Sequence, residues 1–210
     1  MTDLTARLEA VIEPPSDRLL SAFFDSAGPF AGTTFDDLPD NPRDRFTASD
    51  LVAATLLDMR FSPRAVRAIL DLRAEELGRL LAAIPDDVDL WDATDEHLNA
   101  ATVLYRTLRG GGPFKGIGPT TTSKLLARKR PRLIPIVDSV VRDALALSGD
   151  YWSDMRTALQ QADLPDRIEQ VRPDGIGSEV STLRLLDAAV WMRHSNGRAA
   201  KSARLRVGFA

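Results

Sequence analysis

The chain of 210 residues contains no cysteine. This excludes disulfide bridges, thiolate-bound metals, cysteine-held iron–sulfur clusters and a cysteine nucleophile, and it fits a reducing compartment. No apolar run approaches the ~18 residues that a membrane-spanning helix needs. The first residues, MTDLTARLEAVIEPP, lack the basic start and apolar core of a secretion signal. We therefore expect a cytoplasmic protein with no membrane partner.

Strand signals are also scarce. Runs of β-branched residues are short, and no segment alternates apolar and polar residues convincingly with a period of two. Apolar residues instead recur every three or four positions, and 44% of the chain is hydrophobic, enough to bury a core. Ser62 followed by Pro63 predicts one helix start, and Thr47 or Ser49 can cap another. The sequence predicts an all-α fold of roughly ten short helices, with a polar loop over 30–46 and helices over 2–12, 16–27, 47–59, 62–70, 74–84, 95–109, 119–129, 139–147, 150–162, 166–171 and 179–194.

The chain as a whole has no excess of positive charge: its net charge is −3 and its pI is about 5.5. This balance argues mildly against binding to polyanions by bulk charge. The distribution is uneven, however, because the acids lie mostly in residues 1–100 while Lys and Arg gather in 106–132 and after Trp191. A local basic face can bind a polyanion whatever the mean charge. We interpret residues 195–210 as a basic tail, either loose or an ordered arm.

The most unusual stretch is GIGPTTTSKLLARKRPRLIPIVDSVVRDAL, residues 116–145. Its two glycines allow positive φ, Ile117 between them is expected to point into the core, and Pro119 suits a first helical turn. The simplest interpretation is a turn between packed helices, with the basic run as a solvated helix end. The functional one is a clamp in which free N–H groups at the helix start bind phosphate. The residues predicted to contact a DNA backbone are Gly116, Ile117, Gly118, Thr120, Thr121, Lys124, Arg128, Lys129 and Arg130, with Arg132 beside them.

This stretch resembles the helix-hairpin-helix core of the base-excision DNA glycosylases, the superfamily that includes endonuclease III and the adenine glycosylase MutY. Their pattern is a G-h-G hairpin, a small residue opening the next helix, and P-h-h-D at the start of another. Here Pro135-Ile136-Val137-Asp138 matches the second motif, and Asp138 follows Gly116 by 22 residues, as is usual in the superfamily. The segment FTASDLVAATLLDMRFSPRAV resembles the first helix of the glycosylase barrel. LLARKRPRLIPIVD is also similar to a block in a family of uncharacterised bacterial proteins.

The resemblance implies a helix-hairpin-helix glycosylase-like fold in which two helical lobes flank a cleft. Lobe A would comprise about 1–93 with parts of 150–195, and lobe B, carrying the hairpin, about 94–149. The chain termini are expected to return to the same lobe. The implied partner is double-stranded DNA, bound by a monomer associated with the nucleoid. No cofactor is expected, although the hairpin could hold a monovalent cation.

The resemblance assigns catalysis to Asp138. A carboxylate near C1′ of the sugar stabilises the oxocarbenium-like state and positions water, and Lys124, Arg128 and Arg142 would keep it ionised if they lie near it. The other interpretation is a helix N-cap, and both roles can coexist. Bifunctional members carry a lysine where this chain has Thr120, while Lys115 and Lys124 are out of register. We therefore expect a monofunctional enzyme that excises a damaged or modified base and leaves an abasic site.

Excision requires the base to be flipped into a pocket. The candidate pocket residues are Asp58, Met59, Arg60, Tyr151 and Trp152, with Phe61 and Trp91 as weaker ones. The simpler interpretation of each aromatic residue is core packing, and the simpler interpretation of Asp58 and Arg60 is that they lie at a solvated helix end. His97 and His194 are isolated, so no metal site is predicted. Two other functions remain open, a non-catalytic helix-hairpin-helix DNA-binding protein and a helical interaction domain whose hairpin is only a turn.

Overall fold

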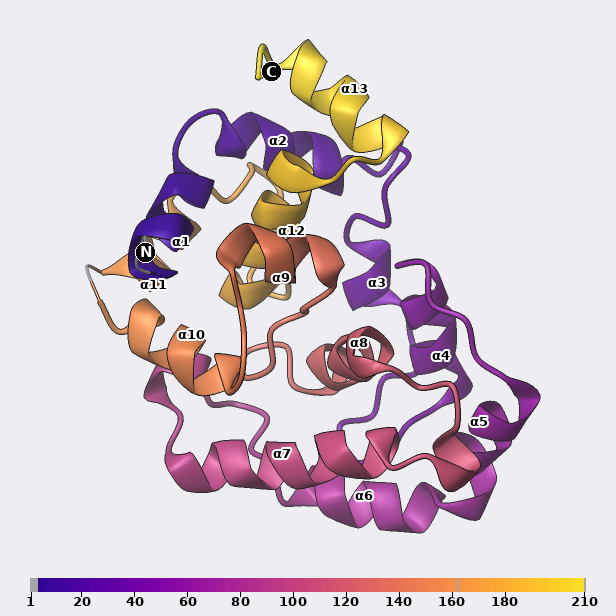
Figure 1. Ribbon diagram of the computed structural model, residues 1–210. Helices are drawn as coiled ribbons and strands as arrows, with labels where there is room; N and C mark the ends of the chain where they lie inside the picture. The colour runs from indigo at the N-terminus through magenta and orange to yellow at the C-terminus, as the bar shows by residue number, and fades with distance from the viewer. Residues whose placement is uncertain (1–3, 162, 210) are drawn as a thin grey trace. The chain divides into compact units, whose positions relative to one another are not determined.

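The computed structural model describes residues 4–161 and 163–209 (Figure 1). All regular secondary structure in these residues is helical, which confirms the predicted all-α class. None of these helices has both the length and the hydropathy that crossing a bilayer requires. The chain divides into two compact units, unit 1 from Met1–Thr33 and Ile136–Ala210 and unit 2 from Thr34–Pro135. The first and the last described helices, α1 and α13, both belong to unit 1.

Unit 1 is built around one buried helix. Its helices are α1 (Leu4–Ile12), α2 (Ser16–Phe24), α9 (Ser139–Leu145), α10 (Tyr151–Leu159), α11 (Leu164–Glu169), α12 (Thr182–His194) and α13 (Arg198–Arg206). Figure 1 shows α12 among the others, and it contacts α1, α2, α9, α11 and α13. Nine of the 13 residues of α12 are buried, including every residue from Leu183 to Val190, as expected for a helix that packs against neighbours on several sides. Its buried Arg184 and Asp187 pair at 2.5 Å, and the Arg184 guanidinium lies 5.1 Å from the Phe23 ring centroid.

The basic tail predicted for 195–210 is an ordered helical arm rather than a loose segment. Helix α13 contacts α12 and α2. Arg204 donates hydrogen bonds to the carbonyl oxygens of Met192 (2.7 Å) and Ser195 (2.9 Å), which end α12. The Arg193 guanidinium stacks over the Phe209 ring at 4.6 Å. Arg204 therefore holds the arm by donating to carbonyls that a helix end leaves unpaired, and Arg193 holds it through the cation–π contact with Phe209.

Unit 2 is a contiguous run of short helices. They are α3 (Thr34–Asp37), α4 (Ala48–Thr55), α5 (Pro63–Arg67), a π-helical turn η1 (Ala68–Leu72), α6 (Ala74–Ala82), a 3₁₀ turn η2 (Leu90–Asp92), α7 (Asp95–Arg109), a 3₁₀ turn η3 (Gly112–Phe114) and α8 (Pro119–Lys129). Helix α3 lies inside the segment 30–46 that the sequence predicted as a loop. The core forms where α8 contacts α4 and α7, and α6 contacts α7.

Local signals start several of these helices. The Ser62 hydroxyl accepts from the backbone N–H of Ala65 at 3.2 Å and Pro63 follows, as predicted. Thr47 is the N-cap of α4, and its N–H donates to Asp50 at 2.7 Å. At α7, the Nδ1 of His97 accepts from the N–H of Thr94 at 3.3 Å in a reciprocal capping box. His97 is therefore a capping residue.

The unit boundaries differ from the predicted lobes. Residues 34–93, expected in lobe A, pack with 94–135, and Asp138, expected in lobe B with the hairpin, belongs to unit 1. The apolar periodicity of α4 and α6 shows which face each helix buries. It does not show that the partners are α8 and α7, because those contacts are between residues far apart in the sequence.

Candidate functional site

The hairpin of residues 116–118 presents its glycines to open space. Gly116 has φ 96°, a conformation that favours glycine, and Gly118 precedes α8 with φ −89°. A Cβ built on either glycine would meet no atom within 4 Å. Ile117 is 7% exposed, and its N–H donates to the Phe114 carbonyl at 3.0 Å. The predicted anchoring of the turn by Ile117 is confirmed, and the glycine backbone on either side stays accessible.

The start of α8 has no side-chain cap. Gly118 is its N-cap, and no described side chain accepts a hydrogen bond from the first turn there. The hydroxyls further along are used inside unit 2, since Thr122 donates to the Gly118 carbonyl at 3.0 Å and Thr121 to the Met59 sulfur at 3.3 Å. Thr121 was predicted to contact DNA, and its buried, occupied hydroxyl does not fit that role. The half-exposed Thr120 remains suited to it.

The basic cluster that follows faces inward. Lys124, Arg128, Lys129 and Arg130 are 6%, 4%, 1% and 3% exposed. The prediction that these four side chains contact a DNA backbone is wrong for this structure, because their charged groups bind partners within unit 2. All of residues 121–130 are buried, so each cation must find acceptors inside the protein.

Asp50 is the anionic centre of this cluster. Its two carboxylate oxygens contact the Arg128 Nε at 3.2 Å and the Lys129 Nζ at 2.6 Å, and the three side chains are 0–1% exposed. Burial lowers the pKa of Lys129, and the hydrogen bond to Asp50 offsets part of that shift. Lys129 also donates to the Asn41 side chain at 2.8 Å and the Pro42 carbonyl at 2.9 Å.

The two guanidinium groups also bind backbone carbonyls in α3, at the end of α6 and in the loops that follow these helices. Arg128 donates to the carbonyls of Phe35, Asp36 and Leu38, and Arg130 to those of Leu81, Ile84 and Arg43. Charge-assisted bonds of this kind replace the water that would otherwise solvate those carbonyls. The cluster therefore fixes the segment between α3 and α4 against the C-terminal end of α8. Arg132 instead forms a surface pair with Asp89.

The predicted pocket segment 58–60 lies beside α8. Asp58 has φ 62°, its N–H donates to the Thr55 carbonyl, and the N–H of Met59 donates to that of Ala54. These bonds form a Schellman motif, so Asp58 terminates α4, as its simpler interpretation held. The Lys124 ammonium donates to the Leu57 carbonyl at 2.7 Å. With the contact between Thr121 and Met59, this places the turn against the hairpin helix.

Three exposed cations on adjacent elements form what we name the hairpin rim, Arg60, Arg64 and Lys115. Helix α5, which carries Arg64, contacts η3, which Lys115 follows. Within the described part of the chain, none of the three forms an ion pair. From the sequence, Arg60 was predicted as a possible base-pocket residue and Lys115 as out of register for lyase chemistry, and neither was predicted to bind phosphate. Arg60 follows Met59 directly and Lys115 precedes Gly116 directly, and this proximity in the sequence could have suggested a phosphate-binding role.

Asp138 caps α9 in unit 1. Its Oδ1 accepts from the Val141 N–H at 3.0 Å, which confirms the capping interpretation. The side chain is half-buried, and within the described residues its Oδ2 accepts no hydrogen bond. Of the cations expected near it, Arg128 pairs with Asp50, and Arg142 lies over the Tyr151 ring at 5.7 Å.

Tyr151 and Trp152 are core residues of unit 1. They are 8% and 5% exposed, and their rings meet edge to face at 5.9 Å. This matches the core-packing interpretation and not a role in stacking a flipped base. Tyr151 and Trp152 belong to unit 1, whereas Met59 and Arg60 belong to unit 2.

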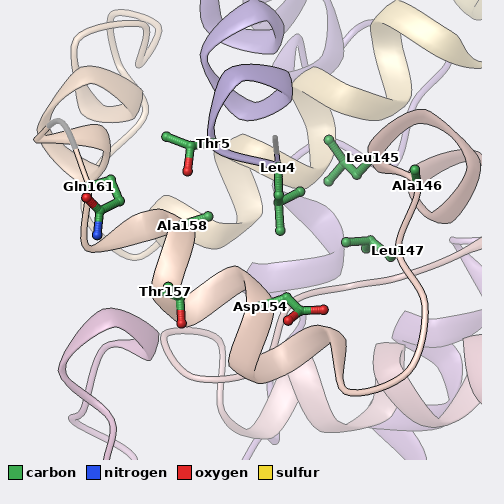
Figure 2. Close-up of a pocket in the computed structure, with 9 residues that line it drawn as sticks. All are labelled: Leu4, Thr5, Leu145, Ala146, Leu147, Asp154, Thr157, Ala158 and Gln161. Carbon is green, nitrogen blue, oxygen red and sulfur yellow. The ribbon is translucent and has the colours of Figure 1, made fainter. Parts of the chain in front are cut away.

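Unit 1 contains a cavity of about 420 Å³ (Figure 2). It is lined by Leu4, Thr5, Leu145, Ala146, Leu147, Asp154, Thr157, Ala158 and Gln161. No candidate pocket residue is among them. Leu145 ends α9, whereas Asp138 precedes its first residue, so roughly 10 Å of helix separates the cavity from that carboxylate. The cavity is therefore not the place where Asp138 would meet a sugar. Over residues 4–161 and 163–209, no group of three or more His, Asp or Glu side chains could hold a metal ion.

Comparison with known proteins relates the chain to a protein family. No curated protein and no solved structure matches the chain. The model of a family of unknown function, DUF6308, matches residues 16–194, which include most of unit 1 and all of unit 2. Because the match covers more than half of the sequence, the protein belongs to the DUF6308 family.

Proposed function

We propose that the protein is a monofunctional DNA glycosylase that excises a damaged or modified base, in genome maintenance or in defence against modified foreign DNA. The observation that carries the proposal is the hairpin. Its two glycines face open space directly before an uncapped helix start. Asp138, the N-cap of α9, follows 22 residues later in the spacing of the glycosylase superfamily. That spacing along the chain connects the two parts of the proposed mechanism.

The hairpin would bind the DNA backbone through its main chain. The N–H groups of the first turn of α8 and the positive end of its dipole attract a phosphate without needing a side chain. The hairpin rim of Arg60, Arg64 and Lys115 would supply the exposed positive charge in place of the buried cluster. Such contacts carry no sequence information, so they suit an enzyme that must scan DNA of any sequence.

Asp138 would act on the sugar. The C1′–N bond breaks with its electron pair leaving on the base, and a bond forms from C1′ to a water oxygen. The Val141 N–H holds Oδ1, so Oδ2 is the oxygen that can face the developing positive charge and accept the proton of the water. The departing base takes a proton from solvent. An abasic site remains.

A lyase step is not part of the proposal. The position of the Schiff-base lysine in bifunctional glycosylases is Thr120 here, and the Lys124 ammonium is buried and donates to the Leu57 carbonyl. Lys115 is exposed but out of register.

One observation favours a second candidate, a DNA-binding protein without catalysis. Asp138 already has a structural role as a helix cap, and the cavity of unit 1 lies at the other end of α9. In that case the hairpin would bind DNA, and Asp138 would only stabilise α9.

The test compares the wild type with Asp138→Asn on duplexes that each carry a different modified or mispaired base, followed by alkaline cleavage of abasic sites. Asparagine is also a good N-cap, so the variant keeps α9 while losing the anionic oxygen. Asp143→Asn, at an exposed position of the same helix, is the matched control. Base release that disappears in Asp138→Asn alone, with DNA binding retained, supports the glycosylase. Binding without release from any duplex supports the second candidate, and the absence of both supports an interaction domain.

A further inference from the structure

The C-terminal segment has a charge opposite to that of the rest of the protein. After Asp187 the chain contains five of its 27 Lys and Arg residues and none of its 30 Asp and Glu residues. This segment comprises the end of α12 and all of α13. A segment without any acid, in a chain of net charge −3, is a strongly asymmetric distribution that calls for a binding partner or a structural reason.

The structure gives two of these cations a structural reason. Arg204 binds the carbonyls that end α12, and Arg193 donates to the Ser16 hydroxyl at 2.8 Å and the Pro14 carbonyl at 3.2 Å. Ala200 and Ala203 are buried on the same side of α13 as Arg204. This side is therefore the packed face of the helix.

The opposite face of α13 is cationic, and the helix contains no Asp or Glu. Arg198, Lys201 and Arg206 are exposed and, in the described structure, form no ion pair. Their spacing places them on one side of a helix, together with Leu205, which is 73% exposed. Helix α2, which contacts α13, carries exposed Asp17 and is followed by exposed Asp25, but within the described residues neither pairs with this face. Figure 1 shows α13 along the outside of unit 1.

The positive charge of the C-terminal segment also affects His194, at the end of α12. Burial is the largest cause that lowers its pKa, and the charges of Arg193 and Arg204 lower it further. The end of α12 therefore disfavours one more cation. A polyanion that approaches α13 would relieve this repulsion.

We propose that the outer face of α13 (Arg198, Lys201 and Arg206) is a second contact for the nucleic-acid phosphate backbone, separate from the hairpin. Three unpaired cations at helical spacing match a row of phosphates, and binding would release counterions from the nucleic acid. The contact is independent of sequence and of the modified base. It rests on the proposed function only in naming DNA as the polyanion.

The experiment measures the affinity of the full chain for an unmodified duplex of mixed sequence by fluorescence anisotropy, from 50 to 300 mM salt. The variant is Arg198→Ala/Lys201→Ala/Arg206→Ala, and the matched control, Arg45→Ala/Arg67→Ala/Arg79→Ala, removes three exposed charges from unit 2. Because each phosphate contact contributes about 0.9 to the slope of log affinity against log salt, the α13 variant should lose roughly 2–3 from the slope. Its affinity at low salt should fall at least tenfold, while the control should retain most of the wild-type affinity and slope.

Equal losses in the two variants would reduce the effect to net charge and overturn the inference. A hairpin-rim variant, Arg60→Ala/Lys115→Ala, separates the two proposals. Loss of binding in the rim variant but not in the α13 variant leaves the glycosylase hypothesis standing and removes this contact. Loss of binding only in the α13 variant supports the α13 contact and counts against the hairpin as a DNA-binding element. Sedimentation with phosphatidylserine vesicles, without binding to the duplex, would assign the face to a lipid surface and refute the nucleic-acid partner.

Discussion

Replacing Asp50 with asparagine should destabilise the protein more than any other single change of charge within unit 2. The substitution keeps the size of the side chain but removes the anion that contacts both Arg128 and Lys129. With the three side chains 0–1% exposed, water cannot take over the lost interaction. Removing one partner of a buried ion pair costs about 3–5 kcal/mol, because a buried charge is left uncompensated. For a chain of this size, that corresponds to a fall in Tm of roughly 6–20 °C at about 2–4 °C per kcal/mol.

Urea unfolding followed by circular dichroism measures this free energy, with Asp89→Asn as the matched control. The pair between Asp89 and Arg132 is partly exposed, with side-chain exposures of 17% and 48%, and is expected to contribute at most about 1 kcal/mol. Adding Lys129→Met to Asp50→Asn should restore part of the loss, because the second substitution removes the stranded ammonium. A loss below about 1 kcal/mol in Asp50→Asn, similar to the control, would refute the structural role assigned to the basic cluster.

Three further predictions follow from single residues. Asp58→Gly should raise the free energy of unfolding by up to about 1 kcal/mol, since a backbone φ of 62° is less strained for glycine than for aspartate. If urea denaturation shows a lower free energy of unfolding for this variant, the Schellman assignment is wrong. Burial and the charges of Arg193 and Arg204 lower the pKa of His194 in the folded state, so as the pH falls the unfolded state takes up this proton before the folded state does. The contribution of His194 to stability should therefore be complete above its ordinary pKa of about 6.5 and be lost as the pH falls through its lower pKa in the folded state. His194→Asn should remove that part of the pH dependence of thermal unfolding, and an unchanged profile would refute it. Borohydride should trap no covalent adduct with an abasic duplex, and an adduct that disappears in Lys115→Ala would disprove the monofunctional assignment.

Much of the helical structure could be predicted from the sequence because its signals are local. Ser62 followed by Pro63 starts α5, Thr47 caps α4, and Asp138 caps α9, each through a bond to a residue three positions away. The G-I-G turn is equally local, since the glycines permit its backbone and the apolar Ile117 between them is buried. Neighbouring residues are enough to decide such features. The all-α class follows from the same kind of pattern.

The tertiary structure decided what the charged residues do. The sequence presents Arg128, Lys129 and Arg130 as a basic run that could bind a polyanion, and only the fold shows that Asp50 and the carbonyls of the segment before α4 surround it. Asp50 and Arg128 are 78 positions apart. Whether a cation is buried depends on such long-range contacts, which its sequence neighbours do not reveal. The same reason separates Arg204, which the fold uses to hold α13, from Arg198 and Arg206, which it leaves exposed to solvent.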